Sequence, residues 1–277
     1  MKKYKYPAVL TIAGSDSGGC AGIQADLKTF AALGCFGTSA ITAVTVQNTL
    51  GIAGIHSIPP AIVAGQIRLV MDDFKPAAIK IGMVYSAELV YTIAGVIRDY
   101  PAVPVILDPV MAATSGDKLI ADETVDALQN ALFPLAALVT PNLAEAGILI
   151  NQTVNNLAEM QSAATEILKT NCFAVLVKGG HLSGQKLYNF YADKNSICKT
   201  YASEAIDTNN TRGTGCSLSA AIAAYLALGL PLTEAIAAAG NYIHAAIKSG
   251  QDVLTGQGNG PINHFFNPSA LIKQALD

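Results

Sequence analysis

The residues with the clearest chemical potential lie in the segment Thr211-Arg-Gly-Thr-Gly-Cys-Ser217, which precedes an Ala- and Leu-rich helical pattern. Gly213 and Gly215 allow the backbone to turn tightly and to approach a ligand closely. The helix that follows would direct free N–H groups and the positive end of its dipole at that ligand, which favours an anion such as phosphate. Cys216 would lie in the first turn, where a thiol ionises more readily and can act as a base. The alternative is an ordinary glycine-rich loop before a packing helix.

Two common nucleotide-binding motifs are excluded at this segment. A P-loop would require Gly-Lys-Ser/Thr after the glycines, and none follows. A dinucleotide fingerprint would require a third glycine, and Leu218 occupies that position. An anion site of another kind is therefore expected.

The elements that would position this segment follow a regular alternation of short β-branched runs and longer helical patterns. The expected strands are 9–12, 39–46, 78–81, 103–107, 137–139 and 175–178. The expected helices lie near 21–33, 60–72, 87–99, 122–131, 143–150, 157–170, 216–228, 232–249 and 269–276. This alternation predicts right-handed βαβ units and a mainly parallel sheet, and the polar-alternating segment 187–202 predicts a surface hairpin. No linker or repeat divides the chain, so residues 1–277 are expected to form a single domain.

Chemically distinctive residues follow each of the expected strands. They are Gly14-Ser-Asp-Ser-Gly-Gly19, Gln47-Asn48, Gly82-Met83, Asp108-Pro-Val-Met111, Thr140-Pro-Asn142 and Lys178-Gly-Gly-His181. Ligand sites in open α/β sheets lie beyond the carboxyl ends of the strands. We therefore expect these segments to line one shared cleft.

The composition limits the class of protein. Of the 277 residues, 51% are hydrophobic and 13% are charged, a balance that supports a large core and excludes intrinsic disorder. The net charge of −3 gives no reason to expect nucleic acid, and no uninterrupted apolar run of about 18 residues predicts a membrane span. Five cysteines without metal or CxxC spacing indicate free thiols in a reducing cytoplasm, and no secretory signal pattern is expected.

Six of the chain's segments together resemble the hydroxymethylpyrimidine/phosphomethylpyrimidine kinases of thiamine biosynthesis, which belong to the ribokinase-like superfamily. The matching segments are Leu10–Gly19, Ala21–Phe30, Asp108–Met111, Thr140–Ala146, Val177–His181 and Gly213–Cys216. The resemblance implies a ribokinase-like three-layer α/β/α sandwich with a central mainly parallel sheet, a homodimer, and dependence on ATP and Mg²⁺. The implied substrates are 4-amino-5-hydroxymethyl-2-methylpyrimidine and then its monophosphate, which is converted to the diphosphate.

The resemblance assigns roles around the transferred phosphoryl group. Cys216 is implied as the base that takes the proton of the substrate hydroxyl; the alternative is a small buried apolar residue. Gly213, Thr214, Gly215 and the Cys216 N–H are implied as an anion hole for the γ-phosphoryl group. Arg212 stands where the family commonly has His, and it either meets phosphate as a rigid fork or faces solvent.

Further residues are implied to bind ATP and Mg²⁺. Asn142 and Glu145 match the family's Asn-x-x-Glu motif, and their oxygens suit a hard cation, although a helix N-cap with its capping box is an equal alternative from the residues alone. Asp108 either contacts water or metal near the phosphates or caps its own loop. Lys178 either contacts the ATP phosphates or extends to solvent.

The substrate ring is implied to meet a second set of residues. Asp26 would face the donor edge of the aminopyrimidine, or it is simply an acid that favours a helix N-terminus. The amide of Gln47 offers both a donor and an acceptor to a pyrimidine edge. Gly14 would permit close backbone approach, and Met83 and Val110 either wall the ring or belong to the core.

One loop departs from the family pattern. Thr114 stands near the position where many members carry Lys, while Ser115-Gly-Asp117 is retained. The sequence therefore does not establish a basic contact from this loop to the substrate phosphate. It also leaves the efficiency of the second phosphorylation undetermined. His181 and His264 lie in family motifs, and packing roles are expected for both.

Three other functions compete with the pyrimidine kinase. A pyridoxal or pyridoxine kinase would share every phosphate-side motif, with dual specificity also open, and Gln47-Asn-Thr49 favours the pyrimidine. A non-catalytic vitamin-binding protein would not need the phosphate-side motifs. A hydrolase with a Cys nucleophile would need a paired His, which no motif supplies.

Overall fold

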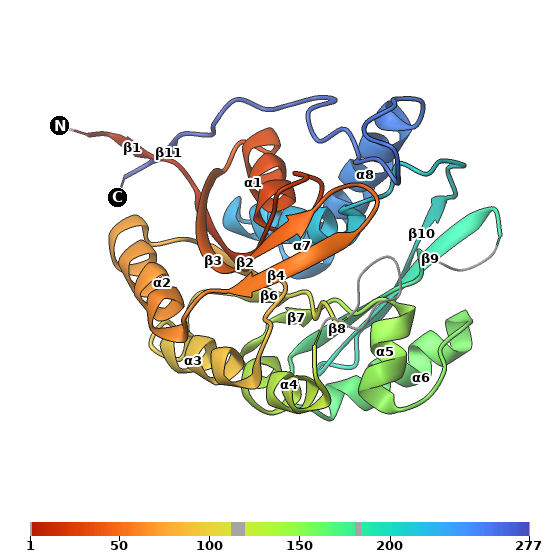
Figure 1. Ribbon diagram of the computed structural model, residues 1–277, viewed down its shortest axis with the longest axis horizontal. Coiled ribbons are helices and arrows are strands. Elements are labelled where there is room, and N and C mark those ends of the chain that lie inside the picture. The colour runs from red at the N-terminus through yellow and green to blue at the C-terminus, as the bar shows by residue number, and fades with distance from the viewer. Residues whose placement is uncertain (1, 112–119, 181–183, 277) are drawn as a thin grey trace.

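The computed structural model describes residues 2–111, 120–180 and 184–276. Within these residues, nine strands form one twisted sheet, and helices cover both of its faces (Figure 1). In order across the sheet the strands are β10 (Cys198–Glu204), β9 (Lys186–Asp193), β8 (Ala174–Lys178), β7 (Leu138–Val139), β6 (Val105–Leu107), β5 (Ala78–Ile81), β2 (Ala8–Asp16), β3 (Phe36–Gln47) and β4 (Ile52–Ser57).

The middle of the sheet is parallel and its edges are antiparallel. Strands from β8 to β3 pair in parallel, whereas β4 pairs antiparallel with β3, and β9 and β10 do so beside β8. The parallel strands β5, β6 and β7 are buried along their whole length, which explains why all of their residues except Lys80 on β5 are apolar. The expected three-layer arrangement around a mainly parallel sheet is confirmed.

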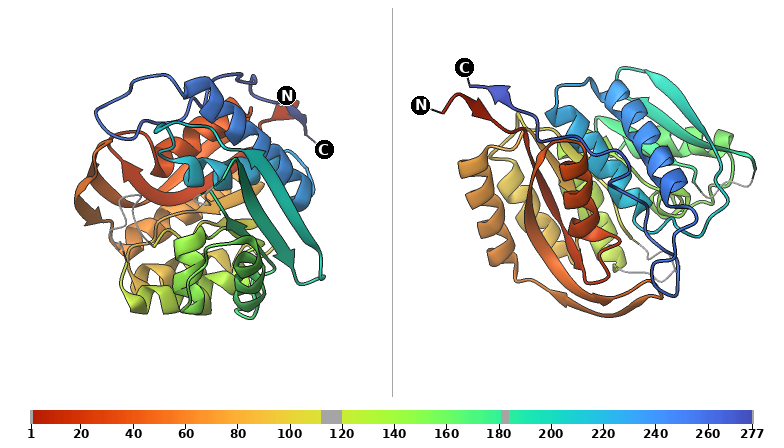
Figure 2. Two further views of the ribbon diagram at one scale, coloured as in Figure 1. Left: turned by 90° about the vertical axis from the view of Figure 1, so that its right-hand side faces the viewer. Right: turned by 90° about the horizontal axis from the view of Figure 1, so that it is seen from above.

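Two layers of helices pack on this sheet, as the views in Figures 1 and 2 show. One face carries α1 (Gly22–Ala32), α7 (Thr214–Ala227) and α8 (Leu232–Gly250). The other carries α2 (Pro60–Phe74), α3 (Ala87–Ile97), α4 (Asp122–Ala127), α5 (Leu143–Ile150) and α6 (Leu157–Leu168). After α4 the chain continues through a π turn, Leu128–Leu132, and a 3₁₀ turn, Phe133–Leu135.

The small side chains of α7 bring its first turn to the strand ends. The run from Ala220 to Ala224 is fully buried against the sheet, where α7 contacts β5, β6 and β2. Because alanine side chains are short, the helix axis lies close to the strands. The N-terminal turn that carries Cys216 is thereby held beside the carboxyl ends of the central strands.

The predicted C-terminal helix over 269–276 is wrong. This segment is extended, and its Gln274–Ala275 forms β11, which pairs antiparallel with β1 (Tyr4–Lys5). Backbone hydrogen bonds from Ser269 N to Ala32 O (2.8 Å) and from Ile272 N to Gly34 O (2.9 Å) hold it along the end of α1. A helical pattern of eight residues is too short to be stable alone, so tertiary hydrogen bonds decide its conformation.

Two hairpins complete the sheet edges. The expected hairpin over 187–202 is confirmed as β9 and β10, and Asp193 caps its turn by accepting from Asn195 N (2.9 Å) and Ile197 N (3.0 Å). The sequence pattern missed β4, which follows a turn where Asn48 Oδ1 accepts from Leu50 N (2.8 Å). No helix in the described ranges is long and apolar enough to cross a membrane.

Candidate active site

An open cleft of about 1870 Å³ lies at the carboxyl ends of the parallel strands. Each group of residues that follows a central strand contributes to its lining, as the sequence pattern predicts. The lining includes Gly14 after β2, Gln47 at the end of β3, Met83 after β5, Asp108 and Val110 after β6, Asn142 after β7, Lys178 at the end of β8 and 211–216 at the start of α7. Residues far apart in the chain therefore meet in one site.

The loop before α7 is shaped by two glycines. Gly213 is the N-cap and adopts a φ of 81°, and a Cβ there would overlap the carbonyl oxygen of Cys20. A Cβ at Gly215 would lie 3.3 Å from Lys178 Nζ, so this glycine leaves room for the lysine. Thr214 donates from its hydroxyl to Thr211 O (2.6 Å) and closes the turn. Thr214 N donates to Thr211 O at 3.2 Å, and Gly215 and Cys216 line the cleft at the start of α7, where the N–H groups of a helix N-terminus suit an anion.

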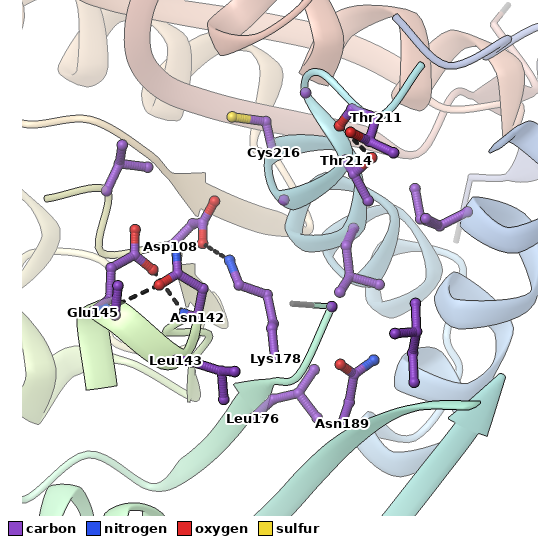
Figure 3. A pocket seen from close by; sticks show the side chains of 18 of the residues that line it. Asp108, Asn142, Leu143, Glu145, Leu176, Lys178, Asn189, Thr211, Thr214 and Cys216 are labelled. Atoms are coloured by element: carbon purple, nitrogen blue, oxygen red, sulfur yellow. Dashed lines mark hydrogen bonds and ion pairs between the residues drawn. The ribbon is translucent and has the colours of Figure 1, made fainter. Parts of the chain in front are cut away.

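Cys216 lines the cleft at the start of α7, across from Asp108 and Lys178 (Figure 3). Burial raises the pKa of its thiol to about 11, and Lys80 acts against this shift by lowering it. This pKa lies above the ordinary value, against the expectation of a more readily ionised thiol, because loss of solvation outweighs the favourable charges. At neutral pH the thiolate is a minor form.

Asp108 and Lys178 form an ion pair at the centre of the site (Figure 3). Lys178 Nζ lies 2.6 Å from Asp108 Oδ1, which also accepts from the hydroxyl of Thr140 at 3.0 Å. Burial would raise the pKa of Asp108, but Lys178 and Lys80 outweigh it and hold that pKa below its usual value. The pair places a permanent carboxylate and an ammonium side by side on the cleft wall.

Asn142 and Glu145 form the complete capping box of α5. Asn142 Oδ1 accepts from Glu145 N at 2.9 Å, and Glu145 Oε2 accepts from Asn142 N at 2.8 Å. Burial raises the pKa of Glu145 to about 7, with Asp108 adding to the shift and Lys178 opposing it. The helix N-cap, which was the alternative role for Asn142 and Glu145, is thus present. The same hydrogen bonds hold both side chains at the cleft.

The donor set at this wall fits a magnesium ion. Asp108 and Glu145 are buried carboxylates that influence each other's protonation, and both line the cleft. Within the described part of the chain, no group of three or more His, Cys, Asp and Glu side chains could enclose a metal. Mg²⁺ suits such a site because it takes one or two carboxylates and keeps waters and phosphate oxygens as its other ligands.

A second wall of the cleft is formed by β2, β3 and the segment after β5. A Cβ at Gly14 would lie 2.8 Å from the terminal methyl of Met83, so glycine lets Met83 reach over this strand end. The Gln47 side chain accepts from the hydroxyl of Thr45 at 3.1 Å, and its backbone is fixed by hydrogen bonds with Ser17 at 2.7 and 2.9 Å. Val110 lines the same cavity.

Asp26 does not line the cleft. Its side chain is fully buried, and Oδ2 accepts from Lys80 Nζ at 2.9 Å and from the hydroxyl of Thr11 at 2.6 Å. Lys80 does line the cleft and was missed by the motif analysis. The available signal was a lysine inside the buried run Ala78-Ile-Lys-Ile81, because a charge on a doubly covered strand needs a partner.

Other predicted residues have simpler positions. Arg212 lines the cleft, its backbone N donates to Gly260 O at 3.0 Å, and its buried Nε has no hydrogen-bond partner among the described residues. His264 is buried, as expected of a packing residue, and its Nε2 lies 2.9 Å from Ser217 Oγ. Thr114, Ser115, Asp117 and His181 lie outside the described residues.

Comparisons with known proteins agree with this site. The family model described as phosphomethylpyrimidine kinase matches residues 16–263. A hydroxymethylpyrimidine/phosphomethylpyrimidine kinase of Rhizobium meliloti (strain 1021) is 49% identical over 92% of this chain and 96% of the relative. The crystal structure of phosphomethylpyrimidine kinase from Clostridium difficile 630 superposes with a TM-score of 0.77 at 42% identity, covering 87% of this chain and 99% of that chain.

A second solved structure extends the similarity to another vitamin kinase. An ADP complex of Bacillus subtilis pyridoxal kinase superposes with a TM-score of 0.87 at 34% identity, covering 94% of this chain and 98% of that chain. The family model and the two relatives above, at 49% and 42% identity, are nevertheless all described as kinases of phosphomethylpyrimidine. With its motifs, its sheet order and these relatives in agreement, the chain belongs to the phosphomethylpyrimidine kinase family.

Proposed function

We propose that this protein transfers the γ-phosphoryl group of ATP to 4-amino-5-hydroxymethyl-2-methylpyrimidine, and then to the resulting monophosphate, in thiamine biosynthesis. The observation that carries this proposal is the meeting of Asp108, Lys178 and Glu145 with the N-terminal turn of α7 in a single cleft. Phosphoryl transfer needs little covalent chemistry from the protein and depends on positioning and charge. This cleft provides both, and its motifs match a family of pyrimidine kinases.

Binding of the ATP phosphates and Mg²⁺ is assigned to the first turn of α7, to Lys178 and to residues that follow β6 and β7. The backbone of Gly213, Thr214, Gly215 and Cys216 would surround the transferring group as an anion hole. Lys178 would contact the ATP phosphates, and Asn142 would lie beside them at the start of α5. Asp108 and Glu145 would hold Mg²⁺, which supplies charge neutralisation for the phosphate oxygens. If the Lys178 ammonium leaves Asp108 and pairs with a phosphate oxygen of ATP instead, it would turn toward the transferring group.

Cys216 is proposed as the base for the first phosphorylation. Its thiolate would accept the proton of the substrate hydroxyl while the alcohol oxygen bonds to the γ-phosphorus and the bond to ADP breaks. The raised pKa of about 11 means that the free enzyme holds little thiolate, so bound charges must favour that form in the working complex. In the second phosphorylation the acceptor is already an anion, and a base is not needed.

The pyrimidine ring is proposed to lie between Gly14, Gln47, Met83 and Val110. Gln47 offers an amide acceptor and donor, which suits an aminopyrimidine edge better than the phenol of pyridoxal. The structural similarity to pyridoxal kinase keeps pyridoxal as the competing substrate.

We further propose a homodimer and a cytoplasmic location, the latter supported by five cysteines that form no disulfide.

The test is phosphorylation of four candidate acceptors with ATP and Mg²⁺, followed by mass spectrometry. The acceptors are hydroxymethylpyrimidine, its monophosphate, pyridoxal and pyridoxine. Product from both pyrimidines is expected. Product from pyridoxal alone would overturn the substrate assignment but leave the fold and the phosphate site unaffected. If none of the four acceptors gives product, the proposed kinase activity is overturned.

A further inference from the structure

A buried ion pair joins β5 to α1 beside the cleft. Lys80 on β5 and Asp26 on α1 each have a side chain with no exposed area, and Lys80 Nζ is 2.9 Å from Asp26 Oδ2. The ammonium has three donors, and Asp26 is its one hydrogen-bond partner among the described residues. Asp26 Oδ1 accepts no hydrogen bond from any described residue. This pair is therefore incompletely satisfied on both sides.

The stability of the fold does not require this buried ion pair. Removing two charges from water is costly, and replacing a buried ion pair by apolar residues of similar size is often neutral or stabilising. Ala78, two residues before Lys80 and therefore on the same face of β5, is apolar and fully buried, which shows that an apolar side chain suits this face of the strand. A role in the cleft explains the pair better: the positive charge of Lys80 can act on groups that line the cleft.

The position of the ammonium supports that role. Lys80 lines the cleft, and a Cβ at Gly82 would lie 2.8 Å from its Nζ, so glycine at this position makes room for the ammonium at the strand end. Burial would lower the pKa of Lys80, but Asp26, then Cys216 and Asp108, raise it, so the ammonium keeps its proton. α7, which carries Cys216 in its first turn, packs directly on β5.

We propose that Lys80, held in place by Asp26, is a positioning residue that stabilises negative charge on Cys216 Sγ and so maintains the thiolate for proton transfer. This inference rests on the proposed function and deepens it. The step itself is unchanged: the thiolate takes the hydroxyl proton, the substrate oxygen bonds to phosphorus, and ADP leaves. It also changes the expected role of Asp26, from contacting the substrate to orienting Lys80.

The decisive variant removes both charges together. In Asp26→Asn combined with Lys80→Met, no buried charge is left unpaired, so the fold is expected to persist with a Tm near that of the wild type. We expect kcat to fall by about tenfold or more with the KM for ATP little changed, because Lys80 lowers the pKa of Cys216 by more than Asp26 raises it, so losing both charges disfavours the thiolate. The matched control is Arg68→Met with Asp99→Asn, the same chemical change at an exposed ion pair, which should leave kcat unaltered.

A second readout does not depend on turnover. The rate of Cys216 alkylation by iodoacetamide, followed on its peptide by mass spectrometry, reports the thiolate directly. It should fall in the double variant and remain at the wild-type rate in the exposed-pair control. Gly82→Ala provides a variant that keeps both charges but displaces the ammonium, and it should slow alkylation as well.

These measurements separate the inference from the proposed function. If the folded double variant keeps wild-type kcat and alkylation rate, or if Lys80→Met alone is impaired and the double variant recovers, the pair is only structural and the inference is overturned. If the wild type phosphorylates no pyrimidine, the proposed function fails, while the alkylation rates still decide whether Lys80 acts on Cys216.

Discussion

Cys216 is subject to two opposing influences that are set by its surroundings. Its place in the first turn of α7 and its neighbour Lys80 favour the thiolate, whereas burial favours the thiol and raises the pKa to about 11. Burial prevails because the thiolate loses more solvation free energy than these groups restore. At the scale of this residue, function therefore depends on the cations held near the sulfur, of which Lys80 is one.

The first prediction at this scale concerns removal of the thiol. Cys216→Ala is expected to fold and to lose about a hundredfold in kcat on hydroxymethylpyrimidine, a typical loss for a general base. Phosphorylation of the monophosphate should suffer less, since its acceptor oxygen is already anionic. Cys198→Ala removes an exposed thiol on β10 and is the matched control. Steady-state kinetics on both acceptors would decide, and an unchanged kcat in Cys216→Ala would remove the base assignment.

At the scale of elements, the loop after α8 connects the two sides of the cleft. Thr49, at the tip of the β3–β4 hairpin, accepts through its hydroxyl from Gln257 N (3.2 Å) and Gly258 N (3.1 Å). The same loop reaches the α7 side, where Gly260 O accepts from Arg212 N at 3.0 Å. In the right-hand view of Figure 2 this blue loop lies at the end of the orange hairpin. The hairpin whose first strand ends at Gln47 and the loop that carries Arg212 are thus tied to one segment.

A prediction follows for the hydroxyl of Thr49. Thr49→Val keeps the shape of the side chain but leaves two backbone N–H groups without an acceptor, so the hairpin that carries Gln47 should loosen. The KM for the pyrimidine is expected to rise several-fold while kcat changes little, and Thr49→Ser should restore the wild-type KM. A Val variant with wild-type KM would show that the hairpin is held by other contacts.

At the scale of the whole molecule, the C-terminal part of the chain is anchored in the interior. His264 is buried, lies 2.9 Å from Ser217 Oγ, and its carbonyl accepts from the Tyr242 hydroxyl at 2.9 Å, so it joins the last segment to α7 and α8. Burial lowers the pKa of His264 to about 4, and the positive charge of Lys28 adds to this shift. The folded protein therefore holds this imidazole neutral.

This buried histidine predicts a loss of stability in mild acid. The folded-state pKa lies below the unfolded value of about 6.5, so the contribution is complete above pH 6.5 and is lost as the pH falls through that value toward about 4. Between pH 7 and pH 5 the free energy of unfolding should decrease by roughly 2 kcal/mol from this group. Urea unfolding at both pH values, compared with His264→Gln, measures it; an equal decrease in the variant would contradict the prediction.

Much of the site was predictable because local patterns report on local structure. The glycines at 213 and 215, the helix after them and the polar residues at the ends of β2, β3, β5, β6, β7 and β8 are fixed by neighbours in the chain. The parallel order of the strands then requires that these ends meet at one edge of the sheet. The shared cleft and the family motifs follow from sequence for this reason.

Only the tertiary structure decided which distant groups pair and how strongly each is desolvated. Asp26 and Lys80 are 54 residues apart, and Thr49 and Gly258 are 209 apart, so no local pattern links them. The extended path of 269–276, the raised pKa of Cys216 and the buried position of Asp26 likewise depend on what packs against each segment. Periodicity and spacing describe a chain's own neighbours, whereas pairing and burial are properties of the assembled sheet and its two helical layers.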